Sequence, residues 1–381
     1  MKNYNQILEE NRAWAEEAFA KIDKKMSAVT LRSRDKLVDG VDANGVHKSV
    51  VPRTWTSGFW GGLNLLLFER TKNEEYYKTA MRSEELLDKA LFNFEELYHD
   101  VGFMWHILSG ANFALTGNAE SRNRNLFAAS SLFSRYVLNG GFIRAWNNKW
   151  QQNDVTNWTI IDCMMNLPLL YWASEELGDD RFKQIAMAHA DTAMTHHVRP
   201  DGSVNHIVVH DLESGEMIGV HGGQGFSGTS CWTRGEAWGL YGYILSYIHT
   251  KEQRYLDTAK RIANYTIAAL AACDYLPPID FRSPERPDLF DSTAGAIMAC
   301  GLIEIAKAVP EHEAKTYIVA AMRLLKAMEA KFCDWTEEKD AILLFGSEDY
   351  HGRGHNMPII YGDYFFTEAI LKLKGTEFLA W

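Results

Sequence analysis

The sequence predicts an all-α protein built as an (α/α)6 barrel, and two observations predict it. A turn followed by the start of a helix recurs along the chain, as in "ERTKNEEYYKTAMRSEELL", "ELGDDRFKQIAMAHADTAM" and "IHTKEQRYLDTAKRIANYT". Each such segment follows an apolar stretch and is typical of the bend of a helical hairpin. Successive helices also alternate between segments rich in Gly and aromatic residues and segments that carry Lys, Glu and Arg on one face. This alternation predicts inner helices covered by outer ones.

The hydrophobic period predicts twelve helices, which make six hairpins. The even-numbered helices are the ones rich in Gly and aromatic residues, so we expect them to form the inner ring. Large closed folds hold chains of this length around one core, and we therefore expect residues 1–381 to form a single domain. The predicted helices cover residues 4–26, 58–70, 73–91, 102–116, 119–138, 160–176, 179–197, 232–249, 252–272, 291–308, 311–333 and 361–375.

One segment departs from the helical period, "DGSVNHIVVHDLESGEMIGVHGGQGFSGTSCW". Apolar and polar residues alternate on both sides of "DLESGE", which predicts a β-hairpin. The following "HGGQGFSGTS" is a Gly-rich loop, but no alternation of strands and helices surrounds it, so it does not form a Walker or dinucleotide-binding fingerprint. We expect this insertion to form a wall or lid at the mouth of the barrel.

Composition and charge exclude several classes of partner. The formal net charge is −11 and no Lys/Arg run is present, so the sequence predicts no nucleic acid partner and no attraction to an anionic membrane surface. The first residues mix charge with apolar residues at helical spacing, unlike a secretory signal, and no window is long and apolar enough to span a bilayer. The five cysteines are scattered without a CxxC pair, which favours reduced thiols and a cytoplasmic location.

The thirteen histidines raise the possibility of a metal site, but the sequence holds no HExxH motif and no other fixed ligand spacing. We therefore predict no bound metal. His189 lies in the small-residue segment "MAHADTAM", and its surroundings are compatible both with a structural histidine and with a site residue.

The candidate site lies where the inner helices begin. Inner helices of such a ring run parallel, so the loops that precede them meet at one mouth. Asp162 stands among apolar residues in "NWTIIDCMM", and His99 with Asp100 directly precedes an apolar helix. A buried carboxylate is costly unless it is paired, hydrogen-bonded or protonated, so Asp100 and Asp162 indicate a chemical role. Asp291 and Asp363 are expected to cap their helices instead.

Aromatic residues and one arginine gather in the same predicted loops and helices. Sugars present apolar faces that pack on aromatic rings, so tryptophans near buried acids favour a carbohydrate ligand. Core packing is the alternative for each single ring, above all for Trp60 and Trp105. Arg234 could bind a substrate carboxylate or its acidic neighbour Glu236. The tryptophans on inner helices or the loops that enter them are Trp55, Trp60, Trp105, Trp158, Trp232 and Trp238.

At these positions the sequence resembles the unsaturated glucuronyl hydrolases, glycoside hydrolase family 88. The resemblance rests on "TWTSGFWGG", "YHDVGF", "IIDCMMNLPLLYWA", "GGQGFSGTSCWTRGEAWGLYG", "DSTAGAIMACGL" and "YGDYFFTEAIL", which follow the family's order over residues 50–375. It implies the same barrel, no metal or cofactor, and removal of a 4,5-unsaturated uronic acid from the non-reducing end of lyase-generated oligosaccharides of glycosaminoglycan type. It also implies that Asp162 is the general acid and base and that Asp100 is its partner. The pocket would be lined by Trp55, His99, His189, Gln224, Trp232, Arg234 and Trp238.

The implied chemistry explains the need for two acids. The C4=C5 double bond forms a vinyl ether with the ring oxygen, so the enzyme can hydrate the alkene instead of attacking the anomeric carbon. A carboxylic acid that stays protonated near working pH is needed to protonate carbon, and an anionic neighbour helps to keep it protonated. The family often has His and Gln where this chain has Gly223 and Glu236, and "GSEDYHGRGHNMPIIYGDY" departs from the Ser and Lys pattern that some members use for sulfated sugars.

Three other interpretations stay open on the sequence. An unsaturated rhamnogalacturonyl hydrolase acting on pectin fragments shares the barrel, an α/α-barrel epimerase or isomerase would use histidines near the mouth, and a non-catalytic toroid would leave the buried acids unexplained. We expect the protein to act as a monomer or a homodimer. Sulfate preference and the polymer of origin do not follow from the sequence.

Overall fold

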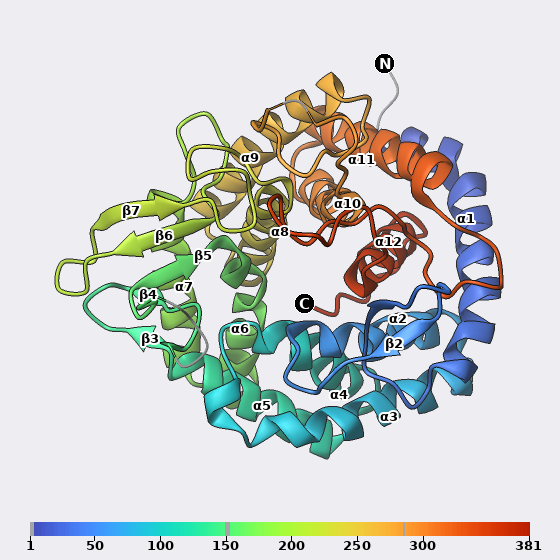
Figure 1. Cartoon of the computed structure of the whole chain (residues 1–381), viewed down its shortest axis with the longest axis horizontal. Coiled ribbons are helices and arrows are strands. Elements are labelled where there is room, and N and C mark those ends of the chain that lie inside the picture. The colour runs from blue at the N-terminus through green and yellow to red at the C-terminus, as the bar shows by residue number, and fades with distance from the viewer. Residues whose placement is uncertain (1–3, 149–152, 285) are drawn as a thin grey trace.

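Two concentric rings of helices make up the protein (Figure 1). The computed structural model describes residues 4–148, 153–284 and 286–381. Within these residues each inner helix contacts the next, and α12 contacts α2 to close the ring. The inner members are α2 (Phe59–Thr71), η3 (Gly102–Gly110) with α4 (Ala111–Thr116), α6 (Leu167–Leu177), α8 (Thr233–Thr250), α10 (Ser292–Ala308) and α12 (Ile360–Leu373). The outer members are α1 (Tyr4–Arg32), α3 (Glu74–Leu91), α5 (Ala119–Phe133), α7 (Asp180–His196), α9 (Gln253–Ala272) and α11 (Glu311–Phe332). The prediction of an (α/α)6 barrel is confirmed.

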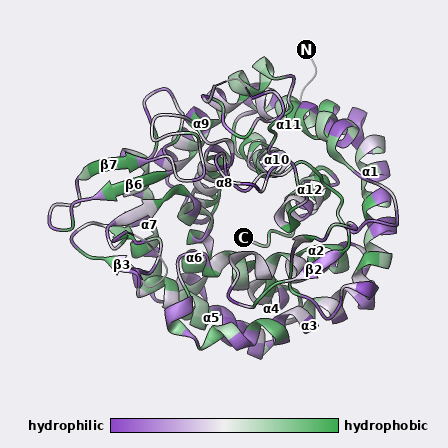
Figure 2. Ribbon diagram, viewed as in Figure 1, coloured by the Kyte–Doolittle hydropathy of each residue, from purple (hydrophilic) through white to green (hydrophobic). Residues whose placement is uncertain are grey.

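The two rings differ in burial as their compositions predict. Every residue of α12 is buried, and so are residues 292–306 of α10. The outer helix α3 instead buries one face, with Tyr76, Ala80 and Leu87 turned inward. Figure 2 shows hydrophilic residues concentrated on the outer ring. A helix that is apolar on all sides is stable only where neighbours surround it, and this requirement places the even-numbered helices inside.

The C-terminus lies near the centre of the ring (Figure 1), and the indole ring of the C-terminal residue, Trp381, is buried. This ring stacks on Phe365 of α12 with centroids 5.7 Å apart, and it also meets Phe103 and Tyr241 of two other inner helices. Its Nε1 donates to Glu368 at 3.0 Å. One large side chain therefore packs against three inner helices at once.

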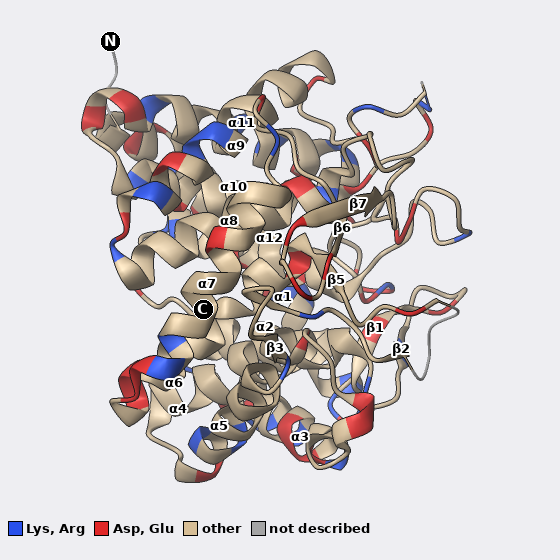
Figure 3. Cartoon of the chain, turned by 90° about the vertical axis from the view of Figure 1, so that its left-hand side faces the viewer, with Lys and Arg blue, Asp and Glu red and all other residues tan. Residues whose placement is uncertain are grey.

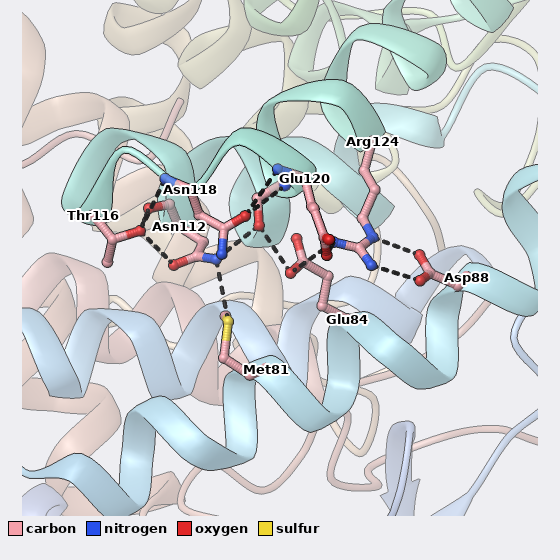
Figure 4. A network of polar contacts seen from close by, with 9 residues as sticks. Met81, Glu84, Asp88, Asn112, Thr116, Asn118, Glu120 and Arg124 are labelled. Carbon is pink, nitrogen blue, oxygen red and sulfur yellow. Dashed lines mark hydrogen bonds and ion pairs between the residues drawn. The ribbon is translucent and has the colours of Figure 1, made fainter.

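Outer helices α3 and α5 are joined by a polar network around the buried Glu84 (Figure 4). Arg124 of α5 donates to both carboxylate oxygens of Asp88, at 2.6 and 2.7 Å. Buried Glu84 accepts from Ser121 at 2.9 Å and lies 3.4 Å from the Arg124 guanidinium. Bidentate pairing of this kind fixes the two helices in one relative position.

Most predicted helices match the structure within a few residues, but the helix predicted over 4–26 continues to Arg32 and the α-helix predicted over 160–176 begins only at Leu167. A third helix differs at its end. The helix predicted over 119–138 stops at Phe133, and the chain then forms a small hairpin of β3 (Tyr136–Val137) and β4 (Phe142–Ile143). The turn contains Asn139, Gly140 and Gly141, and Gly141 has φ +66°, a conformation that favours glycine. Asn-Gly between apolar residues is a hairpin signal, so the sequence already contained the reason for this ending.

The remaining strands lie at one end of the barrel (Figure 3). The predicted insertion forms the hairpin of β6 (Ile207–His210) and β7 (Met217–His221), as expected. Strand β5 (Trp158–Ile160) pairs with β6 and extends this hairpin to three strands directly before Asp162. A second hairpin, β1 (Val38–Val41) with β2 (His47–Ser49), lies at the same end. Short helical turns η1 (Trp55–Gly58), η2 (Phe94–Glu96) and η5 (Ile161–Met165) complete the mouth.

None of the helices in the described ranges combines the length and the apolar composition that crossing a membrane requires.

Packing of η1 against η3 supplies a test of the fold. A Cβ added at Gly58 would lie 2.2 Å from the carbonyl oxygen of Met104 and 2.3 Å from that of Phe103. Gly58→Ala should lower the free energy of unfolding by about 1–3 kcal/mol, because two backbone segments must move apart. Gly219→Ala in β7 is the control, since its nearest neighbour would be 3.9 Å away. Equal stability of the two variants in urea unfolding would contradict this packing.

Candidate active site

Asp100 and Asp162 come from the starts of two neighbouring inner helices. Asp100 precedes η3, and Asp162 lies in η5, the turn that leads from β5 into α6. Their side chains are 10% and 12% exposed, so both carboxyl groups are buried yet reach solvent. The structure thus places the two acids at the mouth, as the parallel inner helices predict.

His99 is held against Asp100 by a carbonyl on its other side. Its Nε2 lies 2.9 Å from Asp100 Oδ1, and its Nδ1 lies 2.9 Å from the carbonyl oxygen of Ala145. The ring thus lies between a backbone carbonyl oxygen and a carboxylate, although its Nε2 makes no hydrogen bond of good geometry among the described residues.

Asp162 is the acid whose environment favours the protonated form. Burial raises the pKa of Asp162 to about 7, and the negative charge of Asp100 acts in the same direction. Positive charge on His99 and Arg234 acts in the opposite direction and limits this rise of the pKa. A carboxylic acid in this state can donate a proton near neutral pH and then act as a base.

Asn166, which the sequence analysis did not single out, bridges the two acidic segments. This residue is fully buried at the start of α6. Its Nδ2 donates to the carbonyl oxygen of Asp162 at 3.3 Å and reaches Asp100 Oδ1 at 3.5 Å, and its Oδ1 accepts from the backbone N–H of Phe103 at 3.0 Å. A Cβ at Gly102 would lie 2.6 Å from Asn166 Oδ1, so only glycine permits this close approach.

The histidine that reaches Asp162 is His206, not the predicted His189. His206 Nε2 lies 3.5 Å from Asp162 Oδ2, and its ring packs on Trp232 with centroids 4.3 Å apart. Burial lowers the pKa of His206 to about 3, so its ring is neutral at working pH. His189 lies on outer helix α7, where its Nδ1 accepts from the backbone N–H of Ile143 at 3.0 Å.

The correct histidine was visible as a pattern in the sequence. His206 directly precedes the first strand of the predicted hairpin, beside the mouth, whereas His189 was placed on an odd-numbered, outer helix. A helix in the outer ring presents its buried face to the back of an inner helix, and His189 Nε2 is buried there without a hydrogen-bond partner among the described residues.

Several buried polar atoms at the mouth have no hydrogen-bond partner among the described residues. They include Asp162 Oδ2, His206 Nε2 and Trp232 Nε1. Buried polar groups are nearly always satisfied, so a cluster of exceptions in contact with each other indicates a place for water or a polar ligand. This cluster surrounds the acid with the raised pKa.

Arg234 pairs with Asp291, not with Glu236. Its guanidinium forms an ion pair with Asp291 and donates to the carbonyl oxygens of Ser347 and Glu348 at 2.6 and 2.7 Å. The carbon of the guanidinium lies 4.5 Å from the Trp232 ring. Glu236 faces Cys231 and Thr266, and its burial raises its pKa to about 8.

Two carboxylates that were expected to cap helices have other roles. Asp291 precedes α10 but makes no capping hydrogen bond from its side chain, because Arg234 and the Thr293 hydroxyl occupy its oxygens. Asp363 accepts from the backbone N–H groups of Ile342 and Leu343 at 2.7–3.1 Å. It therefore holds a neighbouring loop instead of its own helix, which begins three residues earlier.

The predicted aromatic residues divide between the mouth and the core. Trp55 is half-buried and packs on Tyr361 and Phe103, with centroids 5.1 and 5.4 Å apart. Trp238 is fully buried beside Phe103 and Phe365. The fully buried Trp60 and Trp105 are packing residues, as the alternative reading of the sequence allowed.

Gln224 connects the Gly-rich loop to the loop over residues 346–356. Its Nε2 donates to the carbonyl oxygen of Glu348 at 2.6 Å, and its backbone N–H donates to His206 Nδ1 at 3.1 Å. The loop that carries Glu348 is also held by Arg234, so both loops stay close to His206.

No group of three or more His, Cys, Asp or Glu side chains in the described ranges could hold a metal ion.

Comparisons with known proteins agree on one relationship. No family model matches the chain. The chain is 37% identical over 330 residues to the unsaturated glucuronyl hydrolase of Bacillus sp. (strain GL1). This alignment covers 84% of this chain and 86% of that protein. It is 34% identical over 325 residues to the unsaturated chondroitin disaccharide hydrolase of Streptococcus pyogenes serotype M1, covering 84% and 80%.

A solved structure extends the similarity to the fold. The crystal structure of the unsaturated glucuronyl hydrolase from Bacillus sp. GL1, responsible for the degradation of glycosaminoglycan, superposes with a TM-score of 0.89 at 32% identity. The match covers 95% of this chain and 97% of that one.

Replacing Asp162 tests the electrostatic cost of the site. The folded pKa of about 7 exceeds the usual 3.8, so the native state binds the proton more tightly, and stability from this group falls as pH rises through this window. The Asp162→Asn variant does not lose stability in this way, because its amide does not titrate. Its free energy of unfolding relative to the unmodified protein should therefore rise by up to ~4 kcal/mol between about pH 4 and pH 8 in urea unfolding.

Asp42→Asn is the control for this measurement. Asp42 is exposed, and the backbone N–H groups of Val46 and Asn44 lower its pKa, so its replacement should not raise the relative free energy of unfolding between the two pH values. An Asp162→Asn effect that does not change with pH would contradict the assignment.

Proposed function

The chain belongs to the family of the unsaturated glucuronyl hydrolases, and we propose that it removes a 4,5-unsaturated uronic acid from the non-reducing end of glycosaminoglycan-type oligosaccharides. It is a glycoside hydrolase by this membership. The observation that carries the proposal for the site is the buried Asp162, whose pKa is raised to about 7, surrounded by polar atoms without partners. We take residues 1–381 as one catalytic domain.

The proposed reaction is hydration of the C4=C5 bond. Protonated Asp162 gives its proton to C4, and the positive charge that develops at C5 is shared with the ring oxygen. A water molecule adds to C5 and returns a proton to the Asp162 carboxylate. The resulting hemiketal opens, and the bond to the leaving sugar breaks, so one water is consumed in each turnover. The acid must be protonated at the start, which the burial of Asp162 supports.

Asp100 and His99 are proposed to set the charge next to this acid. The negative charge of Asp100 favours the protonated form of Asp162, and the cationic charge of His99 limits the effect. Asp100 also lies where it can contact the sugar hydroxyls. Asn166 keeps the two carboxyl-bearing segments at a fixed separation.

We propose that His206, and not His189, holds the water together with Gln224. The neutral ring has a partner in either tautomer, because its Nδ1 lies 3.1 Å from both the Gly222 carbonyl oxygen and the Gln224 N–H. Nε2 can therefore accept from protonated Asp162 or donate to the ionised form. This adaptability suits a residue beside a group that loses and regains a proton.

Arg234, Trp232, Trp238 and Trp55 are proposed to bind the uronic acid. Arg234 stays cationic, and the negative charge of Asp291 compensates only part of the field it presents to the mouth. Trp55 is half-buried at the rim, so one face of the sugar can stack on its ring.

The pectin alternative acts on the same alkene, and no contact in the structure favours it over the glucuronyl reading. We keep a monomer or homodimer as the expected assembly. The cytoplasmic location remains a prediction from the cysteines, all five of which are unpaired.

The activity test follows the ultraviolet absorbance of the unsaturated uronate, which disappears when the alkene is hydrated. Lyase-made disaccharides from chondroitin, hyaluronan and heparin should lose this absorbance, and their rank order reports sulfate and linkage preference. Loss with pectin fragments alone would move the chain to the rhamnogalacturonyl reading. Loss with none of them would contradict the proposed function.

Replacement of the acid should remove the chemistry but not the fold. Asp162→Asn should lower kcat by about 10²–10⁴-fold, because an amide cannot donate the proton to carbon. His206→Ala should raise KM or lower kcat clearly more than His189→Ala, which serves as its matched control. Normal turnover in folded Asp162→Asn would contradict the mechanism.

The pH profile tests the protonation state. Activity requires protonated Asp162, so kcat/KM should fall about tenfold for each pH unit above the pKa of about 7. A profile that still rises above neutral pH would show that the group acts as a base in its ionised form.

A further inference from the structure

One backbone carbonyl beside the site serves three donors. The oxygen of Ala145 accepts from the backbone N–H of His99 at 3.2 Å, from His99 Nδ1 at 2.9 Å and from Arg135 Nη2 at 3.0 Å. Arg135 and His99 therefore meet at one atom, although 36 residues separate Arg135 from the other donor in sequence. The position of the His99 ring therefore depends on a carbonyl oxygen to which Arg135 also donates.

Arg135 is a buried cation without a carboxylate partner in the described ranges. It is only 4% exposed, and its guanidinium donates to the carbonyl oxygens of Arg144 and Leu97 and to Asn147 Oδ1, besides Ala145. Burial lowers the pKa of Arg135 to about 10, and the nearby charge of Arg144 acts in the same direction. Burying an unpaired charge is costly, so this arginine calls for a reason beyond filling space.

The contacts of Arg135 lead to both acids. His99 Nε2 reaches Asp100 Oδ1 at 2.9 Å, and the backbone N–H of Ala145 donates to the carbonyl oxygen of Trp158 in β5, the strand directly before Asp162. Asp100 is also the aspartate whose charge favours the protonated form of Arg135. Guanidinium, imidazole and carboxylate thus form one line of contacts that ends at Asp100, the carboxylate whose charge acts on the proposed proton donor Asp162.

We propose that Arg135 is a positioning residue for the reaction, which locks the His99 ring against Asp100 through the shared Ala145 carbonyl. The inference rests on the proposed function. Arg135 itself touches neither the substrate nor the reacting atoms. A planar guanidinium with several fixed donors can hold the carbonyls of residues 97, 144 and 145 at once, which a lysine cannot.

The charge around Asp162 gives the proposal a measurable consequence. Asp162 faces Asp100, His99, Arg234 and the neutral His206. When the His99 ring loses its anchor, the negative charge of Asp100 is less compensated, and Asp162 holds its proton to higher pH. The stronger hold on the proton slows its transfer to carbon.

Arg135→Lys keeps the positive charge but removes the forked donor set. We expect kcat to fall about tenfold with KM changed less than about twofold, and the basic limb of the kcat/KM profile to move up by about half a pH unit. Arg124→Lys is the matched control, because it removes a forked guanidinium from the α3–α5 network of Figure 4, which has no contact with His99. This control should lose stability without a change in the pH profile.

A double-mutant cycle with His99→Asn separates positioning from general stability. If Arg135 acts through His99, Arg135→Lys should change kcat by less than about twofold in the His99→Asn background. Additive effects, or an unchanged pH profile in Arg135→Lys, would overturn the proposal. Should Arg135→Lys not fold, Asn147→Ser removes one acceptor of the guanidinium and should give a smaller shift of the same sign.

Failure of this proposal is distinguishable from failure of the proposed function. If the unmodified protein consumes no unsaturated disaccharide, the function fails. If it does so and Arg135→Lys behaves like Arg124→Lys, only the role of Arg135 is lost.

Discussion

The proposed site depends on one carboxyl group, Asp162, whose burial favours its protonated form. Desolvation alone would push the pKa of Asp162 upward, and the charge of Asp100 adds to this effect. The charges of His99 and Arg234 act against these two effects, and the resulting pKa of Asp162 is about 7. Acid and base can exchange roles in one turnover only near such a balance, because a stronger hold would prevent proton donation and a weaker one would leave the group ionised.

The barrel makes this balance possible by bringing unrelated segments to one place. Asp100 and Asp162 lie just before two inner helices, His206 directly precedes a strand of the insertion, and Arg234 lies in the first turn of a third inner helix. Close packing then fixes their separation. Gly102 allows Asn166 to approach η3, and Asn166 joins the two acidic segments. The rigid scaffold thus supplies distances that short loops alone would not hold.

Charge at the mouth is arranged in linked pairs. Arg234 forms an ion pair with Asp291 and also holds the loop over residues 346–356. His99 and Asp100 form a second pair, to which Arg135 is connected through a carbonyl oxygen. An anionic sugar therefore meets a site whose buried cations are already oriented, so little reorganisation is needed when it binds.

The sequence by itself determined the ring, the order of inner and outer helices and the two acids. Helical period and composition are local properties, and Asp162 stood out because a carboxylate among apolar residues needs a reason. The tertiary structure decided which histidine reaches Asp162, which acid pairs with Arg234, and that Asn166 and Arg135 support the site. His206 and Asp291 lie 44 and 57 residues from Asp162 and Arg234, which they contact. Arg135 lies 36 residues from His99, with which it shares the Ala145 carbonyl oxygen. Such contacts depend on how whole helices pack, and the residue pattern within one helix carries no record of the atoms that another segment brings to it.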